Sequence, residues 1–147
     1  MELDNKIIVN QITDFIKSNV NNAGFTKGVI GLSGGLDSAV SAYLSVLALG
    51  KENMHFVLMP YKSSSKESVT DAMKVVESLG VSHSVVEITP MVDAYIDNYT
   101  KEGLSVVRKG NIMARMRMIV LYDISAERNA LVIGTGNKTE ILLGYTT

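Results

Sequence analysis

The hydrophobic positions of the chain follow two spacings that alternate along its length. Short continuous runs of apolar residues are separated by longer stretches in which apolar residues recur every three or four positions. The short runs are typical of buried strands and the longer stretches of amphipathic helices. Their regular alternation predicts β–α–β units, in which right-handed crossovers place helices on both faces of a parallel sheet. We therefore expect an α/β fold with a doubly wound parallel sheet.

The expected elements can be placed by residue range. Strands are predicted at residues 28–32, 55–59, 82–88 and 131–133. Helices are predicted at residues 4–19, from residue 36 to a stop at Gly50, at 66–79, from Pro90 to a break at Gly103, and at 111–129. The apolar face of the first helix comprises Leu3, Ile7, Ile8, Ile12, Phe15 and Ile16. The stripe of the last helix, which suits a core or a subunit contact, comprises Ile112, Met116, Ile119, Val120 and Ile124.

The glycine-rich stretch at residues 28–38 joins an apolar strand, a Ser-Gly-Gly turn and a helix that begins with Asp37 and Ser38 in its first turn. This succession presents free backbone N–H groups to an anion such as a phosphate. The stretch matches neither the P-loop nor the dinucleotide fingerprint. Because an acid beside a polyphosphate needs a divalent cation between them, Asp37 argues for magnesium. The alternative is a tight turn in which Ser33 or Asp37 only caps a helix.

The predicted topology brings a second turn, at residues 134–140, to the same place. In a doubly wound sheet a later strand returns beside the first, and ligands bind at the carboxyl ends of the two strands. If residues 131–133 form the returning strand, Asp37 and Glu140 could share one cation, with Thr135 lining the same pocket. The alternative is an ordinary strand-to-helix turn, capped by Asn137 or Thr139.

Composition narrows the class of protein. With 147 residues, 46% of them hydrophobic and 20% charged, the chain suits one globular domain over residues 1–147. A formal net charge of -1 gives no basic excess to attract nucleic acid. Without cysteine there is no disulfide or thiol chemistry, and the N-terminus lacks a secretory signal, so we expect a cytoplasmic protein. Asp37, three glycines and several serines interrupt the apolar residues 29–49, so no membrane span is expected.

Three motifs occur in an order that resembles a known family. Residues 33–38, Ser-Gly-Gly-Leu-Asp-Ser, resemble the PP-loop of the ATP pyrophosphatase superfamily. Residues 110–118, Gly-Asn-Ile-Met-Ala-Arg-Met-Arg-Met, and residues 134–145, Gly-Thr-Gly-Asn-Lys-Thr-Glu-Ile-Leu-Leu-Gly-Tyr, resemble NAD synthetase. The PP-loop alone indicates only the superfamily, whereas three motifs in order are specific. The resemblance extends from Asp4 to Thr147.

The resemblance implies a Rossmann-like, adenine nucleotide alpha hydrolase-like fold and a ligase of NAD biosynthesis. Such an enzyme amidates nicotinic acid adenine dinucleotide (deamido-NAD) to NAD, with ATP as co-substrate and Mg²⁺ as cofactor. The nicotinate carboxylate attacks the α-phosphate of ATP, pyrophosphate leaves, and ammonia displaces AMP from the acyl-adenylate. The partners implied are these small molecules and a second copy of the chain in a homodimer, without nucleic acid or membrane.

The resemblance also implies a role for each motif residue. Asp37 and Glu140 would bind Mg²⁺ and serve catalysis, Thr135 would contact ATP, and Arg115 would contact deamido-NAD. The loop residues that would hold the ATP phosphates are Gly31, Leu32, Ser33, Gly34, Gly35, Leu36, Asp37 and Ser38. These roles suit the chemistry, because metal ions and amide dipoles stabilise charge that develops during an in-line displacement.

Several other side chains have weaker interpretations. Arg117 lies two positions from Arg115, so we expect it on another side of the helix, as a surface charge or a subunit contact. His55 and His83 lack metal-ligand spacing. Residues 59–61 end a predicted strand, where they could flank the adenine or simply pack against the neighbouring strand.

Two other functions stay open on the sequence alone. Another PP-loop enzyme, GMP synthetase-like or tRNA-modifying, would keep the loop and use a different acceptor. A non-catalytic nucleotide-binding module would bind ATP without turnover. The family's domain also extends beyond residue 147, and the loop has no lysine of its own. We therefore expect this polypeptide to hold an incomplete, inactive site. The absence of a glutaminase-like domain favours free ammonia, with a separate glutaminase subunit as the alternative.

Overall fold

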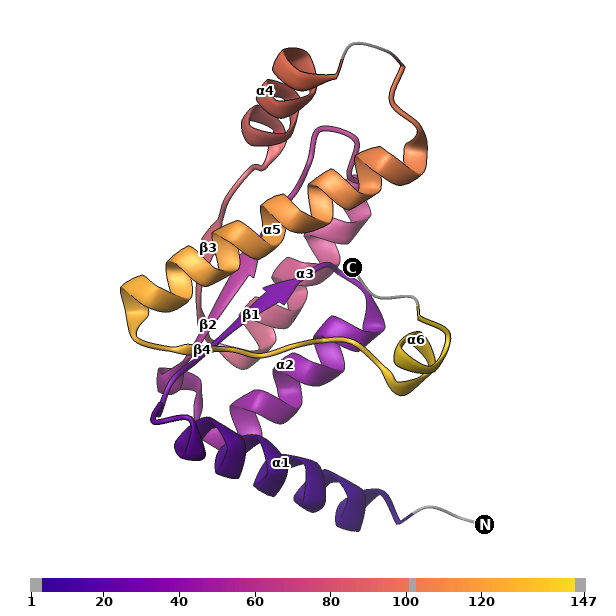
Figure 1. Cartoon of the computed structure of the whole chain (residues 1–147). Helices are drawn as coiled ribbons and strands as arrows, with labels where there is room; N and C mark the ends of the chain where they lie inside the picture. Colours follow the sequence, from indigo (N-terminus) through magenta and orange to yellow (C-terminus); the bar gives the residue numbers. More distant parts are fainter. Residues whose placement is uncertain (1–3, 101–102, 145–147) are drawn as a thin grey trace.

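A parallel sheet organises the molecule. The computed structural model describes residues 4–100 and 103–144, and within them it has four strands in the order β3-β2-β1-β4 (Figure 1). The strands are β1 (Gly28–Leu32), β2 (Met54–Leu58), β3 (Ser82–Val85) and β4 (Leu131–Val132). Gly28 is paired with Met54 on one side and with Leu131 on the other. The predicted return of the last strand beside the first is therefore confirmed.

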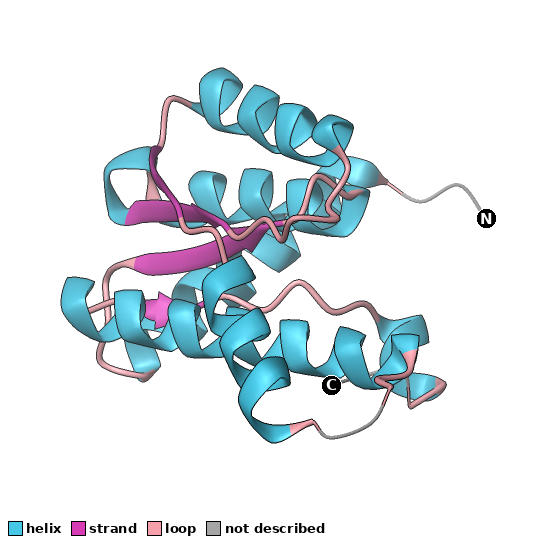
Figure 2. Ribbon diagram, turned by 90° about the horizontal axis from the view of Figure 1, so that it is seen from above, coloured by secondary structure: helices cyan, strands magenta, loops and turns pink. Residues whose placement is uncertain are grey.

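Helices cover both faces of this sheet, as predicted (Figure 2). The helices are α1 (Asn5–Asn22), α2 (Leu36–Leu49), α3 (Lys66–Leu79), α4 (Thr89–Tyr99), α5 (Val106–Arg128), α6 (Lys138–Leu142) and the short 3₁₀ helix η1 (Lys51–Asn53). Helices α2 and α3 pack on one face, and α4 and α5 pack on the other. Helix α1 packs against α2, outside the layer that contacts the sheet (Figure 1).

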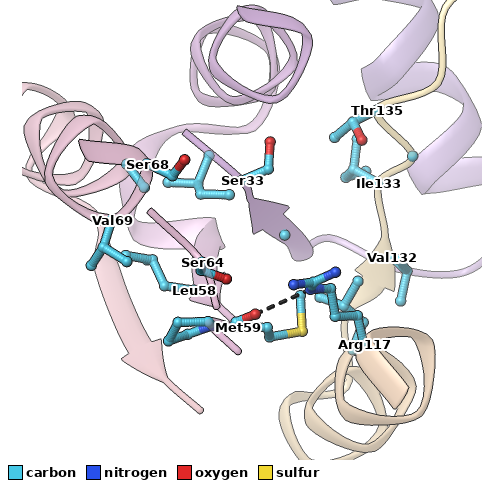
Figure 3. A pocket seen from close by; sticks show the side chains of 16 residues that line it. Ser33, Leu58, Met59, Ser64, Ser68, Val69, Arg117, Val132, Ile133 and Thr135 are labelled. Carbon is cyan, nitrogen blue, oxygen red and sulfur yellow. Dashed lines mark hydrogen bonds between the residues drawn. The ribbon is translucent and has the colours of Figure 1, made fainter. Parts of the chain in front are cut away.

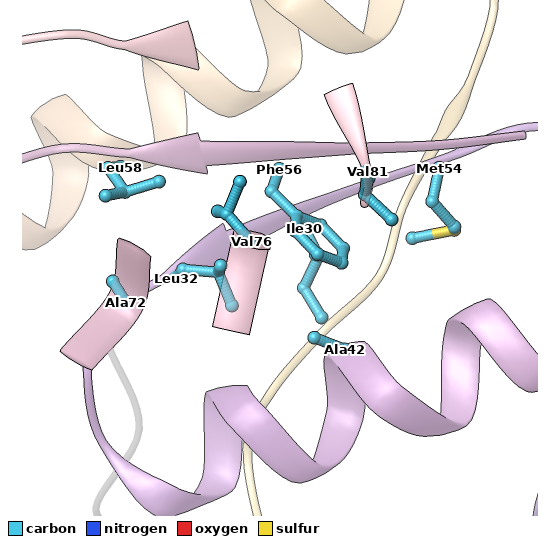
Figure 4. Close-up of a cluster of buried hydrophobic side chains, with 9 residues drawn as sticks. All are labelled: Ile30, Leu32, Ala42, Met54, Phe56, Leu58, Ala72, Val76 and Val81. Atoms are coloured by element: carbon cyan, nitrogen blue, oxygen red, sulfur yellow. The ribbon is translucent and has the colours of Figure 1, made fainter. Parts of the chain in front are cut away.

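The side chains of the strands alternate between two apolar cores. Ile30 of β1 and Phe56 of β2 point toward Ala42 of α2 in the first core (Figure 4). Val29 and Val57, their neighbours in sequence, point to the other face, where they join the core under α4 and α5. Burial on both faces explains why these strands read as continuous apolar runs.

Several boundaries differ from the sequence-based ranges. Strand β2 begins and ends one residue early, at Met54 and Leu58. Strand β3 ends at Val85 and not at residue 88, although the Val86 and Ile88 N–H groups still donate to the Leu58 and Pro60 carbonyls, and Ile88 is buried. Strand β4 is one residue shorter than expected, and α1 continues three residues further. Helix α5 begins at Val106 because Ser105 caps it, so Gly110 lies inside the helix and not before it.

The boundaries of α2 and α3 agree with the sequence. Gly50 and Gly80 follow their last residues with positive φ angles of 84° and 61°. Glycine adopts this conformation without a steric penalty, which is why it ends helices so often. Among the described residues no helix is long and apolar enough to cross a membrane.

Two predicted apolar faces are only partly buried. On α1, Ile7 and Phe15 are 54% and 67% exposed, and the fully buried residue is Val20. Leu3, which was expected on this face, lies outside the described residues. On α5, Ile119 is exposed although the rest of its predicted stripe joins the core beneath the helix.

Candidate functional site

A cavity of about 360 Å³ opens at the carboxyl ends of β1, β2 and β4, where the strand order reverses (Figure 3). Apolar side chains, hydroxyl groups and one guanidinium line it: Gly31, Leu32, Ser33, Leu58, Met59, Pro60, Ser64, Ser68, Val69, Ala72, Arg117, Leu121, Val132, Ile133, Gly134 and Thr135. This is the position at which open α/β sheets bind ligands. Its volume falls within the range of small-molecule sites.

The turn after β1 holds its shape through two serines. The Ser33 N–H donates to Ser38 Oγ at 3.2 Å, and Ser38 Oγ donates to the Gly35 carbonyl at 2.9 Å. The Gly35 N–H donates back to Ser33 Oγ at 3.2 Å. Gly35 is the N-cap of α2, and no side chain caps the helix. The interpretation in which Ser33 or Asp37 caps α2 is therefore wrong, and the first-turn N–H groups keep the orientation that binds anions.

Gly34 brings this turn into contact with α3. Its φ angle is +83°, and a Cβ atom at this position would overlap the Ser68 carbonyl group of α3. Glycine is needed here for both reasons, since other residues rarely adopt this φ and carry the atom that would collide. The contact places the N-terminus of α2 beside the first turn of α3, on one side of the cavity.

The turn after β4 is built differently. The side chain of Asn137 caps α6 by accepting from the Glu140 N–H at 2.9 Å. Glu140 Oε2 in turn accepts from the Asn137 N–H at 3.0 Å, which completes a capping box. The interpretation that Asn137 caps a strand-to-helix turn is thus confirmed, and Thr139 is not the cap.

The structure brings together some of the predicted site residues. Gly31, Leu32, Ser33 and Thr135 line the cavity, whereas residues 34–38 and Glu140 do not. Asp37 is exposed in the first turn of α2, and Glu140 is half-buried in the first turn of α6. Asp37 follows β1 and Glu140 follows β4, and these two strands are neighbours in the sheet. Among the described residues no group of three or more His, Cys, Asp or Glu side chains could hold a metal ion by itself.

The two arginines of α5 lie on different sides of the helix. Arg115 is exposed, and it donates to the Asn111 carbonyl of its own helix at 3.1 Å. Arg117 is half-buried, lines the cavity, and donates from Nε to the Met59 carbonyl at 3.1 Å (Figure 3). The expectation of a surface charge or subunit contact for Arg117 is wrong, because α5 crosses the sheet so that this side of the helix faces the end of β2. Burial lowers the pKa of the Arg117 guanidinium.

The segment after β2 forms another part of the cavity wall. Met59 and Pro60 line the cavity, whereas Tyr61 is buried behind it and donates from its hydroxyl group to Asp93 of α4 at 2.8 Å. Lys62 Nζ lies 2.5 Å from the second oxygen of Asp93. These hydrogen bonds, from Lys62 first and Tyr61 second, lower the pKa of the Asp93 carboxyl group. They attach α4 to the end of β2.

The histidines lie away from this cavity. His55 is buried in β2, and its two ring nitrogens each lie 2.9 Å from a hydroxyl oxygen of β3, that of Ser82 or that of Ser84. Burial is the main reason that its pKa falls from 6.5 to about 4, with smaller contributions from Arg128 and His83. A neutral histidine with both nitrogens engaged is a structural group and has no position left for a metal ion.

Sequence reasoning missed three polar side chains of the cavity, those of Ser64, Ser68 and Arg117. The serines belong to a serine-rich segment between β2 and α3, where Ser65 caps the helix. A signal for them was present, since a polar run that follows a buried strand lies at the ligand-binding edge of the sheet. Arg117 gave no such signal, because its environment depends on how α5 crosses that edge.

Comparisons with known proteins agree on one family. A model of the NAD synthase family matches residues 8–147. An NH(3)-dependent NAD(+) synthetase of Fusobacterium nucleatum is 52% identical over 147 residues, which is all of this chain and 56% of that protein. The chain spans about half the length of the curated relatives it matches.

Solved structures are similar as well. An NH3-dependent NAD synthetase from Campylobacter jejuni, in complex with the nitrate ion, superposes with a TM-score of 0.92 at 43% identity. The match covers 99% of this chain and 62% of that one. A glutamine-dependent NAD+ synthetase from Acinetobacter baumannii, in complex with ADP, gives a TM-score of 0.90 at 32% identity, over 95% of this chain and 27% of that one.

Proposed function

The chain belongs to the NAD synthase family, and from this premise we propose that the complete protein amidates deamido-NAD to NAD at the expense of ATP. The nicotinate carboxylate attacks the α-phosphate of ATP, which forms an acyl-adenylate and releases pyrophosphate. Ammonia then attacks the acyl carbon, and AMP leaves. We place both steps at the carboxyl edge of the sheet, beside the turn after β1.

One observation carries this proposal: the turn after β1 leaves the N-terminus of α2 without a side-chain cap at the edge of the cavity. Backbone N–H groups and the helix dipole at such an end favour a phosphate. We propose that residues 31–38 hold the phosphates of ATP and that Thr135 contacts the nucleotide from the turn after β4. The cavity between them takes the rest of the nucleotide.

We further propose that Asp37 and Glu140 hold Mg²⁺ together with the nucleotide. Two carboxylates at the ends of neighbouring strands fit this ion, which commonly takes one or two carboxylates and completes its shell with phosphate oxygens and water. When bound, the ion offsets negative charge on the phosphates. The Asn137 N–H donates to Glu140 Oε2, which fixes the direction of that carboxylate.

Arg115 is proposed to contact deamido-NAD from the outer side of α5. Its exposure places it outside the cavity, so the part of the substrate that it meets lies beyond the nucleotide pocket. Met118, Ile119 and Tyr122 are exposed on the same helix and offer apolar surface for a homodimer. Ammonia is the nitrogen donor in this proposal, and the absence of cysteine agrees with a cytoplasmic location.

The test supplies the complete protein with Mg-ATP, ammonia and deamido-NAD. We expect AMP, pyrophosphate and NAD in equal amounts, and no NAD when ammonia or deamido-NAD is left out. Glutamine in place of ammonia tests the nitrogen source. Asp37→Asn should abolish turnover, whereas the matched variant Asp71→Asn, at an exposed acid that pairs with Lys74 on α3, should not. ATP binding without formation of AMP would reject the enzyme in favour of a nucleotide-binding module.

A further inference from the structure

We propose that Arg117 positions ATP by placing its guanidinium group against the adenine base inside the cavity. The inference rests on the proposed nucleotide site and adds a residue to which neither the motifs nor the comparisons gave a role. It begins from the chemistry of the cavity wall. Arg117 is the only charged side chain among the described residues that line the cavity.

The guanidinium group is held in place by the protein through one of its nitrogens. Nε donates to the Met59 carbonyl at 3.1 Å. Among the described residues this is the one hydrogen bond of the guanidinium group. The bond fixes the plane of the guanidinium at the end of β2 (Figure 3). An arginine held at Nε keeps a flat, charged face and two further nitrogens for a ligand.

The charge of Arg117 has no compensating partner within the described residues. The two ion pairs found there join Lys62 to Asp93 and Lys74 to Asp71, and neither involves Arg117. Burial lowers its pKa, and no acidic group acts in the opposite direction. A half-buried cation of this kind costs stability, which a methionine of similar length would avoid. A ligand that contacts the Arg117 guanidinium would explain why the protein keeps a charged group at this position.

The position of Arg117 favours the base over the phosphates. Figure 3 shows Arg117 and Met59 on one side of the cavity and Ser33 and Thr135 on the other. The phosphate-binding turn begins at Ser33, so the phosphates lie on the far side from the guanidinium. The walls between the two sides are largely apolar, with Leu58, Val69 and Ile133 among them. A planar heteroaromatic ring fits such a space, and arginine stacks well on ring faces.

The experiment compares two ligands that share their phosphates and differ in the base. ATP and inorganic tripolyphosphate are titrated, each with Mg²⁺, into the complete wild-type protein and into its Arg117→Met and Arg117→Lys variants. Arg117→Met removes the desolvated cation–π contact and should weaken ATP binding roughly five- to thirty-fold, whereas Arg117→Lys keeps a cation but loses the planar group and should weaken it less. Tripolyphosphate should bind all three proteins equally. The matched variant Arg108→Met, at an exposed arginine of the same helix, should bind ATP like the wild type.

Each other outcome has a defined meaning. Unchanged ATP binding in both variants would overturn the inference and leave the proposed function intact. An equal loss for ATP and tripolyphosphate at full stoichiometry would also overturn it, because Arg117 would then serve the phosphates. A folding defect would instead lower the number of binding sites, which the stoichiometry reports, and Arg117→Gln would then replace the failing variant. If the complete wild-type protein bound neither ligand, the proposed nucleotide site itself would be rejected.

Discussion

Two turns at the same edge of the sheet each join a strand to a helix, and they differ in whether a side chain accepts from the first N–H groups of that helix. The turn after β4 satisfies the start of α6 internally, through the reciprocal bonds of Asn137 and Glu140. The turn after β1 uses Ser33 and Ser38 to shape the loop and leaves the start of α2 without a side-chain cap. The start of α6 therefore has a side-chain acceptor for one of its first N–H groups, whereas the start of α2 has none.

The difference shows why motif composition alone does not identify a helix N-terminus that is open to an anion. Both turns contain two glycines, a hydroxyl-bearing residue and an acid. What separates them is the residue at the N-cap, asparagine in one case and glycine in the other. An asparagine side chain occupies a first-turn N–H that a phosphate would otherwise use. A glycine at the same position leaves that N–H group to the ligand.

The largest expected difference in stability is between two variants that each add a Cβ atom, one in each turn. Gly34→Ala should lower the free energy of unfolding by about 3 kcal/mol or more, because the new Cβ meets the Ser68 carbonyl and φ is +83°. Gly134→Ala should cost less than about 1 kcal/mol, since no atom lies within 4 Å of its added Cβ. Urea denaturation of both variants measures the contrast. Equal losses would show that the two turns are equally tolerant.

A pH titration tests His55, a buried side chain whose polar atoms, like the start of α6, find their hydrogen-bond partners within the protein. Neutral His55 is bonded to Ser82 and Ser84, and its pKa falls from 6.5 to about 4. Since the unfolded chain binds a proton more readily between these values, acidification from pH 6.5 to 4 should lower the free energy of unfolding. We expect about 1–3 kcal/mol from this group.

The comparison with His55→Gln isolates that contribution, because carboxyl groups titrate in both proteins. The variant should lose less stability over the same pH range, whereas above pH 6.5 the pH dependence of the two proteins should coincide. Denaturant unfolding at a series of pH values provides the measurement. Parallel curves down to pH 4 would contradict a depressed pKa at His55.

A smaller effect is expected from removing the cap of α6. Asn137→Ala should destabilise this helix by about 1 kcal/mol, because the Glu140 N–H loses its acceptor. Hydrogen exchange at the amide of Glu140 reports the change directly, and its protection should fall. Thr139→Ala is the matched control, since Thr139 lies in the same helix and caps nothing. Equal protection in the two variants would argue against the capping box.

The smallest change in stability is expected where a cap is added to α2. Gly35→Ser supplies a hydroxyl at the N-cap, and because its Cβ would lie 3.3 Å from Ser33 Oγ, a side-chain atom that must shift slightly, we expect a change of only a few tenths of a kcal/mol in the free energy of unfolding. The new hydroxyl competes with the phosphate for a first-turn N–H, so ATP affinity should fall although stability does not. Parallel thermal unfolding and ATP titration measure both quantities. Unchanged ATP affinity would mean that this N–H is not part of the nucleotide site.

Much of the fold could be predicted from local signals. The serine cap and Gly80 define α3, and apolar runs buried on both faces define β1 and β2. The return of a later strand beside the first followed from the doubly wound topology that the alternation of strands and helices predicts. The boundary of α5 was wrong because the capping residue Ser105 starts the helix at Val106, so Gly110 lies within α5 although glycine disfavours helix interiors.

The site was less predictable because it depends on packing between distant segments. The spacing of Arg115 and Arg117 correctly placed them on different sides of one helix. Which side faces the cavity is decided by the contact of Arg117 with Met59, which lies 58 positions earlier in the sequence. No pattern within α5 contains that information. The roles of Asp37, Glu140, Thr135 and Arg115 stay predictions, of which the Asp37→Asn variant tests the first.

The pairing of β1 with β4 also has a consequence for how the protein folds. Strands β1 and β2 are close in sequence, whereas pairing Gly28 with Leu131 closes a loop that contains most of the chain. The entropy lost in closing long loops makes such parallel contacts slow to form. Thr135 and Glu140 therefore reach the turn after β1 only when this last strand docks. A nucleotide that bridges the two turns would act on that late contact, so its binding should slow unfolding by keeping β4 in place.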